Sequence, residues 1–211
     1  MNYIVQMIRF LLIPLILCFT LLPSFSALRG GVDYKIPFDY TKLNQAELES
    51  KAEFYYTSAL NTKELNENMT YALNLYALLS DAYPENITYF LRLGKLYDVL
   101  GKDRYAKGQF YRAMNVNPSR PEPYFYLGDF YYEREQYRKA LKFYLKAYDF
   151  GYSEHYQTLE KIGTIYQKFG DTENALYYLQ CAVVLNPSDD LYARINNIKS
   201  ADDINSEYYK N

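Results

Sequence analysis

The chain is short of the residues that build metal centres and disulfide frameworks. Its 211 residues include one histidine, His155, two cysteines, Cys18 and Cys181, and no tryptophan. A zinc site needs several His or Cys ligands at characteristic spacings, and this histidine has no cysteine beside it. Cys18 lies in a segment that we expect to be removed, which leaves no pair to form an intrachain disulfide. The sequence therefore predicts no metal site and a fold that packing alone stabilises.

A strong excess of one charge is also missing. The chain has 23 Lys and Arg against 25 Asp and Glu, a formal net charge of −2, whereas a nucleic-acid-binding face is strongly basic. No glycine-rich phosphate loop is present, because the glycines of Leu100-Gly101-Lys102 and Phe169-Gly170-Asp171 fit helix ends. His155 is interpreted as a solvated loop residue. We therefore expect no nucleic-acid partner, no cofactor and no enzymatic activity.

One short pattern recurs three times along the chain. Leu or Ile, Gly, two further residues and Tyr begin at Leu93, Leu127 and Ile162, so that the glycines stand 34 and 35 residues apart. Alanines repeat at the same interval, in one row at Ala72, Ala106, Ala140 and Ala175 and in another at Ala113, Ala147 and Ala182. A period of about 34 residues is typical of stacked helical hairpins, whose helices approach closely only at small residues.

The pattern resembles that of the tetratricopeptide repeat family, TPR. In that family each unit has a large residue, then Leu-Gly, Tyr, Ala, an aromatic residue, a second Ala and Pro at fixed positions. The matching units are a degenerate one at about 53–86, with Leu60 where glycine belongs, and three others at 87–120, 121–155 and 156–189. The resemblance implies an all-α fold, a right-handed α-solenoid of TPR helix-turn-helix repeats with a C-terminal capping helix.

Local signals agree with the period. Gly101 and Gly170 fall where the first helix of a hairpin should end, since glycine takes the left-handed conformation without penalty. Asp103 and Asp171 follow them and are placed to cap the second helix. One residue is inserted near Tyr152, which predicts a longer loop between the last two intact units.

The segments around the repeats divide the rest of the chain. Residues 27–40 contain Gly30-Gly31 and Pro37 without a helical period and are interpreted as a linker. The solenoid is expected over 41–199 and ends in a capping helix at 189–199, where Leu191, Ile195 and Ile198 share one face. Residues 200–211 are expected to form a disordered tail.

The N-terminus has the pattern of a secretory signal peptide over residues 1–26. Arg9 precedes an apolar run of 13 residues from Phe10 to Leu22, and Ser24 and Ser26 follow at small-x-small spacing. A membrane span needs about 20 apolar residues, so we favour cleavage after Ser26. The protein is then exported and is either periplasmic or secreted. An uncleaved segment would instead anchor it in the inner membrane, facing outward, and only then is membrane contact expected.

The TPR resemblance also implies a partner-binding surface. Positions 2, 5, 9 and 12 of each first helix line the concave groove of such proteins, and their mixed charge and apolar centre suit an extended segment or an amphipathic helix. The residues predicted to bind a partner are Leu91, Lys95, Asp98, Phe125, Asp129, Tyr132, Glu160 and Thr164. Two other interpretations stay open for this face, a solvated surface and one that the protein's own termini fill.

The predicted function is that of an extracytoplasmic scaffold or adaptor that binds a protein or peptide partner in the groove. The alternative belongs to a different class, a membrane-anchored assembly or structural factor whose repeats stack homotypically. The two differ first in whether the N-terminal segment stays attached.

Overall fold

The computed structural model describes residues 35–62 and 64–208, with side chains as far as residue 200. Within these ranges the regular structure is helical and contains no strand. Two short 3-10 helices are η2 (Tyr40–Lys42) and η3 (Tyr152–Glu154). The α-helices are α2 (Gln45–Thr62), α3 (Glu67–Ala82), α4 (Ile87–Val99), α5 (Asp103–Val116), α6 (Pro121–Tyr132), α7 (Tyr137–Asp149), α8 (Tyr156–Lys168), α9 (Thr172–Leu185) and α10 (Asp189–Tyr208). The predicted signal peptide, residues 1–26, and the first part of the predicted linker lie outside these ranges.

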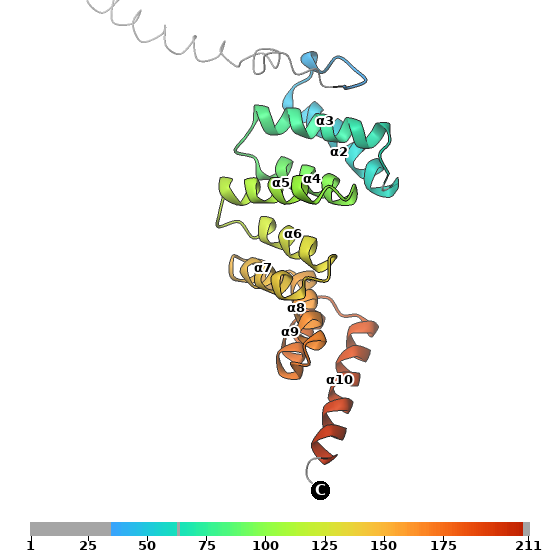
Figure 1. The fold of residues 1–211 in the computed structure, drawn as a ribbon, viewed down its shortest axis with the longest axis vertical. Helices are drawn as coiled ribbons and strands as arrows, with labels where there is room; N and C mark the ends of the chain where they lie inside the picture. The colour runs from blue at the N-terminus through green and yellow to red at the C-terminus, as the bar shows by residue number, and fades with distance from the viewer. Residues whose placement is uncertain (1–34, 63, 209–211) are drawn as a thin grey trace, which may run out of the picture.

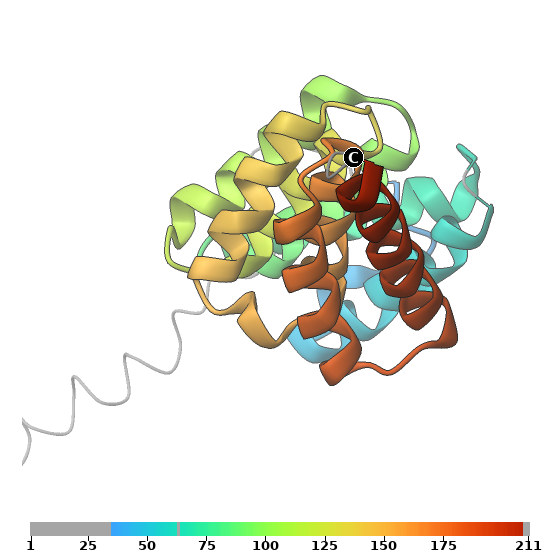
Figure 2. The ribbon, with the colours of Figure 1, turned by 90° about the horizontal axis from the view of Figure 1, so that it is seen from below.

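The α-helices pack as successive hairpins, α2 with α3, α4 with α5, α6 with α7 and α8 with α9. Each hairpin also packs on the next through α3 and α4, α5 and α6, and α7 and α8, and α10 packs on α9. Figure 1 shows the hairpins stacked along the longest axis, and Figure 2, seen from below, has α10 at the near end of the stack. The all-α solenoid of helix-turn-helix repeats predicted by the period is confirmed.

The repeated glycines lie where the two helices of a hairpin come closest. A Cβ atom added to Gly128 on α6 would lie 2.5 Å from Cδ1 of Tyr144 on α7, and one added to Gly163 would lie 2.8 Å from Cγ of Leu179. Gly94 and Phe110 repeat this contact between α4 and α5. Because atoms this close would overlap, glycine at these three positions lets a large side chain of the second helix lie across the first.

The turns inside the hairpins have the expected backbone conformation. Gly101 and Gly170 have φ angles of 66° and 74°, which favours glycine. The hairpin of α6 and α7, which lies between these two, has Glu135 at the corresponding position, with a φ of 56°. Asp171 caps α9, because its carboxylate accepts a hydrogen bond from the backbone N–H of Asn174 at 3.1 Å. Asp103 is instead the first residue of α5, whose cap position is Lys102, so the predicted cap at Asp103 is wrong.

The first hairpin follows the repeat pattern in a different register from the predicted one. Ala52 of α2 is fully buried, and the ring centroid of Tyr55 lies 5.3 Å from that of Tyr71 on α3. The next hairpin repeats this ring contact at 5.3 Å between Tyr97 and Tyr105. Since Tyr97 follows its small residue by three positions, as Tyr55 follows Ala52, the structure places Ala52 at the glycine position.

This register differs from the unit predicted at about 53–86, which puts Leu60 at the glycine position. The helix begins at Gln45 and has 18 residues, whereas α4 has 13. Two differences from the other units explain why the sequence does not reveal this register. Alanine replaces glycine at the contact, and the additional turns of α2 lengthen the spacing to the next unit beyond the usual period.

The segment before α2 packs on the first hairpin. The side-chain amide of Asn74 on α3 donates to the backbone carbonyl of Lys35 at 2.9 Å. The Lys51 ammonium on α2 lies 4.5 Å from the ring centroid of Phe38. Residues 35–40, the described part of the predicted linker 27–40, therefore cover one end of the solenoid.

At the other end, α10 extends to Tyr208, beyond residue 199, where the sequence pattern ends the helix. Its apolar face stops at Ile198, but no glycine or proline follows to end the helix. Leu191 and Ile195 are buried in a cluster with Leu179 of α9. Residues 200–208 of the predicted disordered tail are thus helical, and 209–211 lie outside the described ranges.

Candidate protein-binding face

The predicted partner-binding residues all lie on the first helices of the hairpins, α4, α6 and α8. We call the surface formed by these helices, together with the adjoining side of α2, the first-helix face. Its helices are neighbours in space as well as in the repeat, because α2 contacts α4 and α4 contacts α6. Leu91 is an exception to the prediction. It is 5% exposed and packs in the core with Ile87 and Phe110, so it is a packing residue that a partner cannot reach.

A pocket of about 660 Å³ opens on the first-helix face. The Nζ atom of Lys95 lies 3.4 Å from a carboxylate oxygen of Asp98. Asp98 is also 2.8 Å from Arg134, and its side chain is 9% exposed. The pocket is lined by Leu60, Lys95, Asp98, Val99, Glu133 and Arg134. Two of the predicted residues, Lys95 and Asp98, therefore share a pocket whose walls are both charged and apolar.

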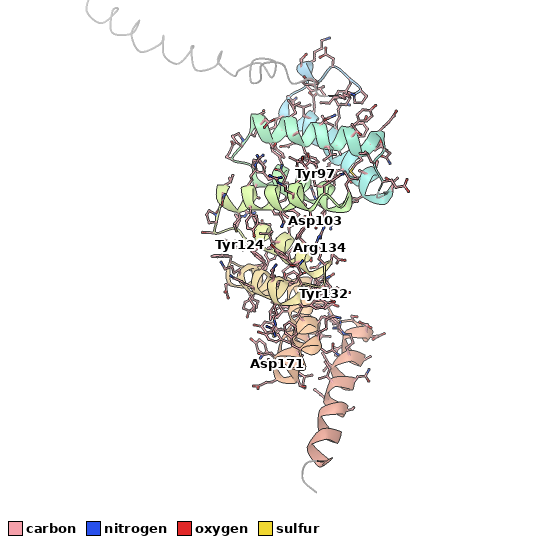
Figure 3. The ribbon with its side chains drawn as sticks, viewed as in Figure 1. Tyr97, Asp103, Tyr124, Tyr132, Arg134 and Asp171 are labelled. Carbon is pink, nitrogen blue, oxygen red and sulfur yellow. The ribbon has the colours of Figure 1, made fainter. Side chains whose placement is uncertain are left out.

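Arg134, which the repeat positions do not identify, organises the pocket. Its guanidinium donates to both carboxylate oxygens of Asp103, at 2.6 and 3.0 Å, and to the carbonyl of Phe130 at 2.8 Å. It also lies 3.6 Å above the Phe130 ring. These hydrogen bonds raise the pKa of Arg134 and lower that of Asp103. Figure 3 labels Arg134 and Asp103, which come from adjacent hairpins. The arginine follows the end of α6, which is why a pattern of positions within the helix does not find it.

Asp129 on α6 lies at the centre of the first-helix face. It accepts a hydrogen bond of 2.6 Å from the Tyr144 hydroxyl. Burial raises the pKa of Asp129, and the charges of Lys161 and Lys95 oppose that rise. The Lys161 ammonium lies 4.1 Å from the ring centroid of Tyr132. An ammonium thus covers a half-buried aromatic ring, and the neighbouring Tyr144 ring, 6.4 Å away, connects it to the Asp129 carboxylate.

Phe125 and His155 form an aromatic cluster beside this centre. The His155 ring lies 4.4 Å from the Tyr152 ring and 5.0 Å from the Phe125 ring. Its Nδ1 atom is 2.9 Å from the Thr158 hydroxyl, and burial lowers the pKa of the imidazole. The prediction of a solvated His155 is wrong, because the lengthened loop folds as η3 and brings the ring against Phe125 of α6. Phe125 is correspondingly part of a packed cluster.

The last helix contributes to the same face. Arg194 of α10 lies 3.1 Å from a carboxylate oxygen of Glu160 and donates to the Thr164 hydroxyl at 2.8 Å. Both predicted residues of α8 are therefore already bound by a side chain of the protein. The open interpretation that the protein's own termini fill the groove applies to this end of the face.

The face extends in the other direction onto α2. Arg92 of α4 pairs with Glu53 at 3.0 Å, and its guanidinium lies 4.5 Å from the Tyr56 ring centroid. The Tyr89 hydroxyl donates to Glu49. The shifted register of the first hairpin explains why the sequence does not predict Glu49 and Glu53 as residues of this face.

Neither a metal-binding cluster nor a membrane-spanning helix is found among the described residues. Residues 35–62 and 64–208 contain no group of three His, Cys, Asp or Glu that could hold a metal ion. No helix in this part of the chain combines the length and apolar character that a membrane span requires.

The hairpin stack and its register define the class of fold, a TPR-like α-solenoid. No family model and no curated protein matches the chain. Among solved structures, the chain is similar to proteins named MamA. One MamA crystal structure has a TM-score of 0.58 and 17% sequence identity, over 79% of this chain and 88% of that chain. MamA from Desulfovibrio magneticus RS-1 has a TM-score of 0.56 and 16% identity, over 72% of this chain and 86% of that one. This likeness shows the fold.

Proposed function

We propose that the protein is an extracytoplasmic TPR scaffold that binds a partner protein along its first-helix face. The observation that carries the proposal is the pocket formed by Lys95, Asp98 and Arg134. It presents hydrogen-bonding groups of both charges beside the apolar side chains of Leu60 and Val99. Preorganised polar groups around an apolar floor are what a peptide or helix with mixed side chains requires.

The centre of the face supplies the second set of contacts. Tyr132 is half-buried, the Lys161 ammonium lies over its ring, and its ring lies 6.4 Å from that of Tyr144, which donates to Asp129. Tyrosine in such a setting gives a partner both apolar area and a polar end. A segment that crosses α4 and α6 would meet the pocket first and Tyr132 next. The partner is therefore an extended peptide or an amphipathic helix of another protein.

Site-specific photo-cross-linking in the producing cell tests this assignment. A photoreactive amino acid replaces Lys95 or Tyr132 in the full chain, and the matched control replaces Tyr177 on α9, which is 53% exposed. The proposal predicts the same cross-linked protein from both face positions and not from Tyr177. Equal capture from all three positions, or capture from Tyr177 alone, would contradict it.

The extracytoplasmic location rests on the apolar run from Phe10 to Leu22 and the small residues after it. Intact-mass measurement of the protein isolated from its native cell tests this part separately. A chain that begins at Ala27 in the exported fraction supports cleavage and export. A chain that retains Met1 in membranes would support the anchored alternative, and a cytoplasmic chain would contradict both.

Homotypic stacking, the alternative function, has little support at the C-terminal end. Helix α10 follows the last hairpin at the place where the first helix of another repeat would lie. A second copy of the protein that continued the stack would have to pack on the exposed side of α10. The exposed side chains of α10 include the small or polar Ala193, Asn196, Asn197 and Ser200, and the Tyr192 ring, which is 50% exposed, is the large one among them. They favour a capped end that contacts water, as terminal repeats require.

A further inference from the structure

The second helices of the hairpins differ sharply in charge. α5 and α7 together carry seven Lys and Arg and two acidic residues. α3 and α9, the second helices on either side of them, contain no Lys or Arg. In a chain with a net charge of −2, the cations of the second helices are thus confined to two successive levels of the stack (Figure 1).

The repeat register shows that these cations occupy equivalent outward positions. Arg104 of α5 corresponds to Arg138 of α7, and Arg112 corresponds to Lys146. The same two positions hold Glu173 and Cys181 in α9. We call the exposed cations of the two helices the basic ridge: Arg104, Arg112, Arg138, Lys139, Lys142 and Lys146.

Little negative charge offsets the basic ridge. Among the described residues, no ion pair includes Arg104, Arg112, Arg138 or Lys142. The acidic residue of α5, Asp103, is bound by Arg134 at 2.6 Å. The positive potential of the ridge is therefore directed to solvent, where it can attract an anionic partner.

Exposed aromatic side chains adjoin these cations, since Tyr105 follows Arg104 and Tyr111 precedes Arg112 in the chain. Tyr105, Tyr111 and Phe150 are 61%, 36% and 41% exposed. Lys and Arg side chains can spread their methylene groups on an apolar surface while their charges reach phosphates. Amphipathic rings at the level of such charges are typical of proteins that rest on a bilayer surface.

We propose that the basic ridge docks the protein on a membrane surface containing anionic phospholipids. The aromatic side chains favour a lipid surface over an acidic polypeptide, because rings interspersed with long cations can enter the headgroup region. The ridge lies on the second helices, so the first-helix face stays free for its partner. The inference does not depend on the proposed scaffold function.

Vesicle flotation of the full chain tests the proposal. Partition coefficients are measured on phosphatidylcholine vesicles with and without phosphatidylglycerol, and their ratio is the anionic preference. One variant carries Arg104→Gln, Arg112→Gln, Lys142→Gln and Lys146→Gln. The matched control carries Lys42→Gln, Lys51→Gln, Lys168→Gln and Lys199→Gln, four exposed lysines elsewhere. Residues 1–34 are identical in all three proteins, so their contribution to the comparison cancels.

The wild type should prefer anionic vesicles, and the ridge variant should lose at least about thirtyfold of that preference. The control should stay within about threefold of the wild type, and circular dichroism should show that both variants are folded. An equal loss in both variants would attribute the effect to net charge and overturn the proposal. Absence of any anionic preference in the wild type would also overturn it, whether or not the ridge binds a polyglutamate peptide.

Discussion

Glu135 has a φ of 56° in the turn between α6 and α7, where the two neighbouring hairpins place Gly101 and Gly170. A residue with a Cβ atom is strained in this conformation, and glycine is not. The three equivalent turns therefore have the same backbone conformation, with a side chain at Glu135 and without one at Gly101 and Gly170. The middle hairpin, which carries both Arg134 and the central residues of the first-helix face, is also the one with the strained turn.

Replacement of Glu135 by glycine should raise the free energy of unfolding by about 0.5 to 1 kcal/mol, because relief of the left-handed strain outweighs the greater flexibility of the unfolded chain. Urea denaturation measures the change. Gly170→Ala is the matched control and should lower stability by a similar amount. An unchanged or lower stability of the Glu135 variant would show that the turn is not strained.

His155 predicts a pH dependence that can be assigned to one residue, since it is the only histidine of the chain. Burial lowers its pKa in the folded protein below the ordinary value of 6.5. As the pH falls, the unfolded chain binds the proton first, so stability should decrease below that value until the folded pKa is reached. The urea midpoint should therefore decrease as the pH is lowered from about 7 through the ordinary value of 6.5. His155→Gln should remove most of this slope, and an equal slope in the variant would assign it elsewhere.

At the scale of helices, ion pairs connect successive units along the first-helix face. In each case the acid belongs to the earlier unit and the base to the next one: Glu53 with Arg92, Asp98 with Arg134, and Glu160 with Arg194. Exposed pairs of this kind contribute little. Asp98 is 9% exposed, and its pair with Arg134 is therefore the one in which a measurable contribution is expected.

A double-mutant cycle of Arg134→Gln and Asp98→Asn should give a coupling of about 1 kcal/mol in urea denaturation. The coupling should decrease in about 1 M salt, since mobile ions screen the partly exposed guanidinium. The pair Arg92→Gln and Glu53→Gln is the more exposed comparison and should couple more weakly. Additive effects of the Arg134 and Asp98 variants would show that the pair between these two residues does not stabilise the junction.

Helix α10 should stabilise the solenoid through its first half. Leu191 and Ile195 are 3% and 5% exposed, and their loss with α10 exposes the end of α9. A chain that stops after Ser188 should be about 3 to 5 kcal/mol less stable. One that stops after Ser200 should stay within about 0.5 kcal/mol of the full chain. Equal stability of the two truncated chains would contradict the capping role.

The sequence predicts the helices well where the contact residue is glycine. Gly94, Gly128 and Gly163 mark the hairpins from α4 to α9, because a large side chain of the second helix crosses each of them. Ala52 performs the same task in α2 without the glycine signature, so the register of the first hairpin is not predicted. The polar second half of α10 is also not predicted, because it lacks the apolar period by which a helix is recognised in a sequence.

The accessible residues of the first-helix face are predicted less completely than the helices. Lys95 and Asp98 do line a pocket, but Leu91 from the same pattern is buried. Arg134 follows its helix, and its role depends on an ion pair with the preceding hairpin, which no pattern within one repeat contains. Positions in a repeat therefore predict which side of each first helix contributes to the common face. Contacts between repeats decide which side chains on that face remain accessible.

At the scale of the whole molecule, the two proposed surfaces lie on different sets of helices. The first helices carry the pocket at Lys95 and Asp98, and the second helices α5 and α7 carry the basic ridge. A protein bound to a membrane through α5 and α7 could therefore still hold a partner on α4 and α6. This arrangement suits a scaffold, which must bind one component without releasing another.

The central claim is that the first-helix face binds the partner, and affinity for the partner identified by cross-linking tests it most directly. Isothermal titration of the full chain should give a Kd at least about tenfold weaker for Lys95→Ala with Tyr132→Ala than for the wild type. Tyr177→Ala with Tyr192→Ala, two exposed tyrosines of α9 and α10, should leave the Kd within about twofold. An unchanged Kd for the Lys95 and Tyr132 variant, with the partner still bound, would contradict the account.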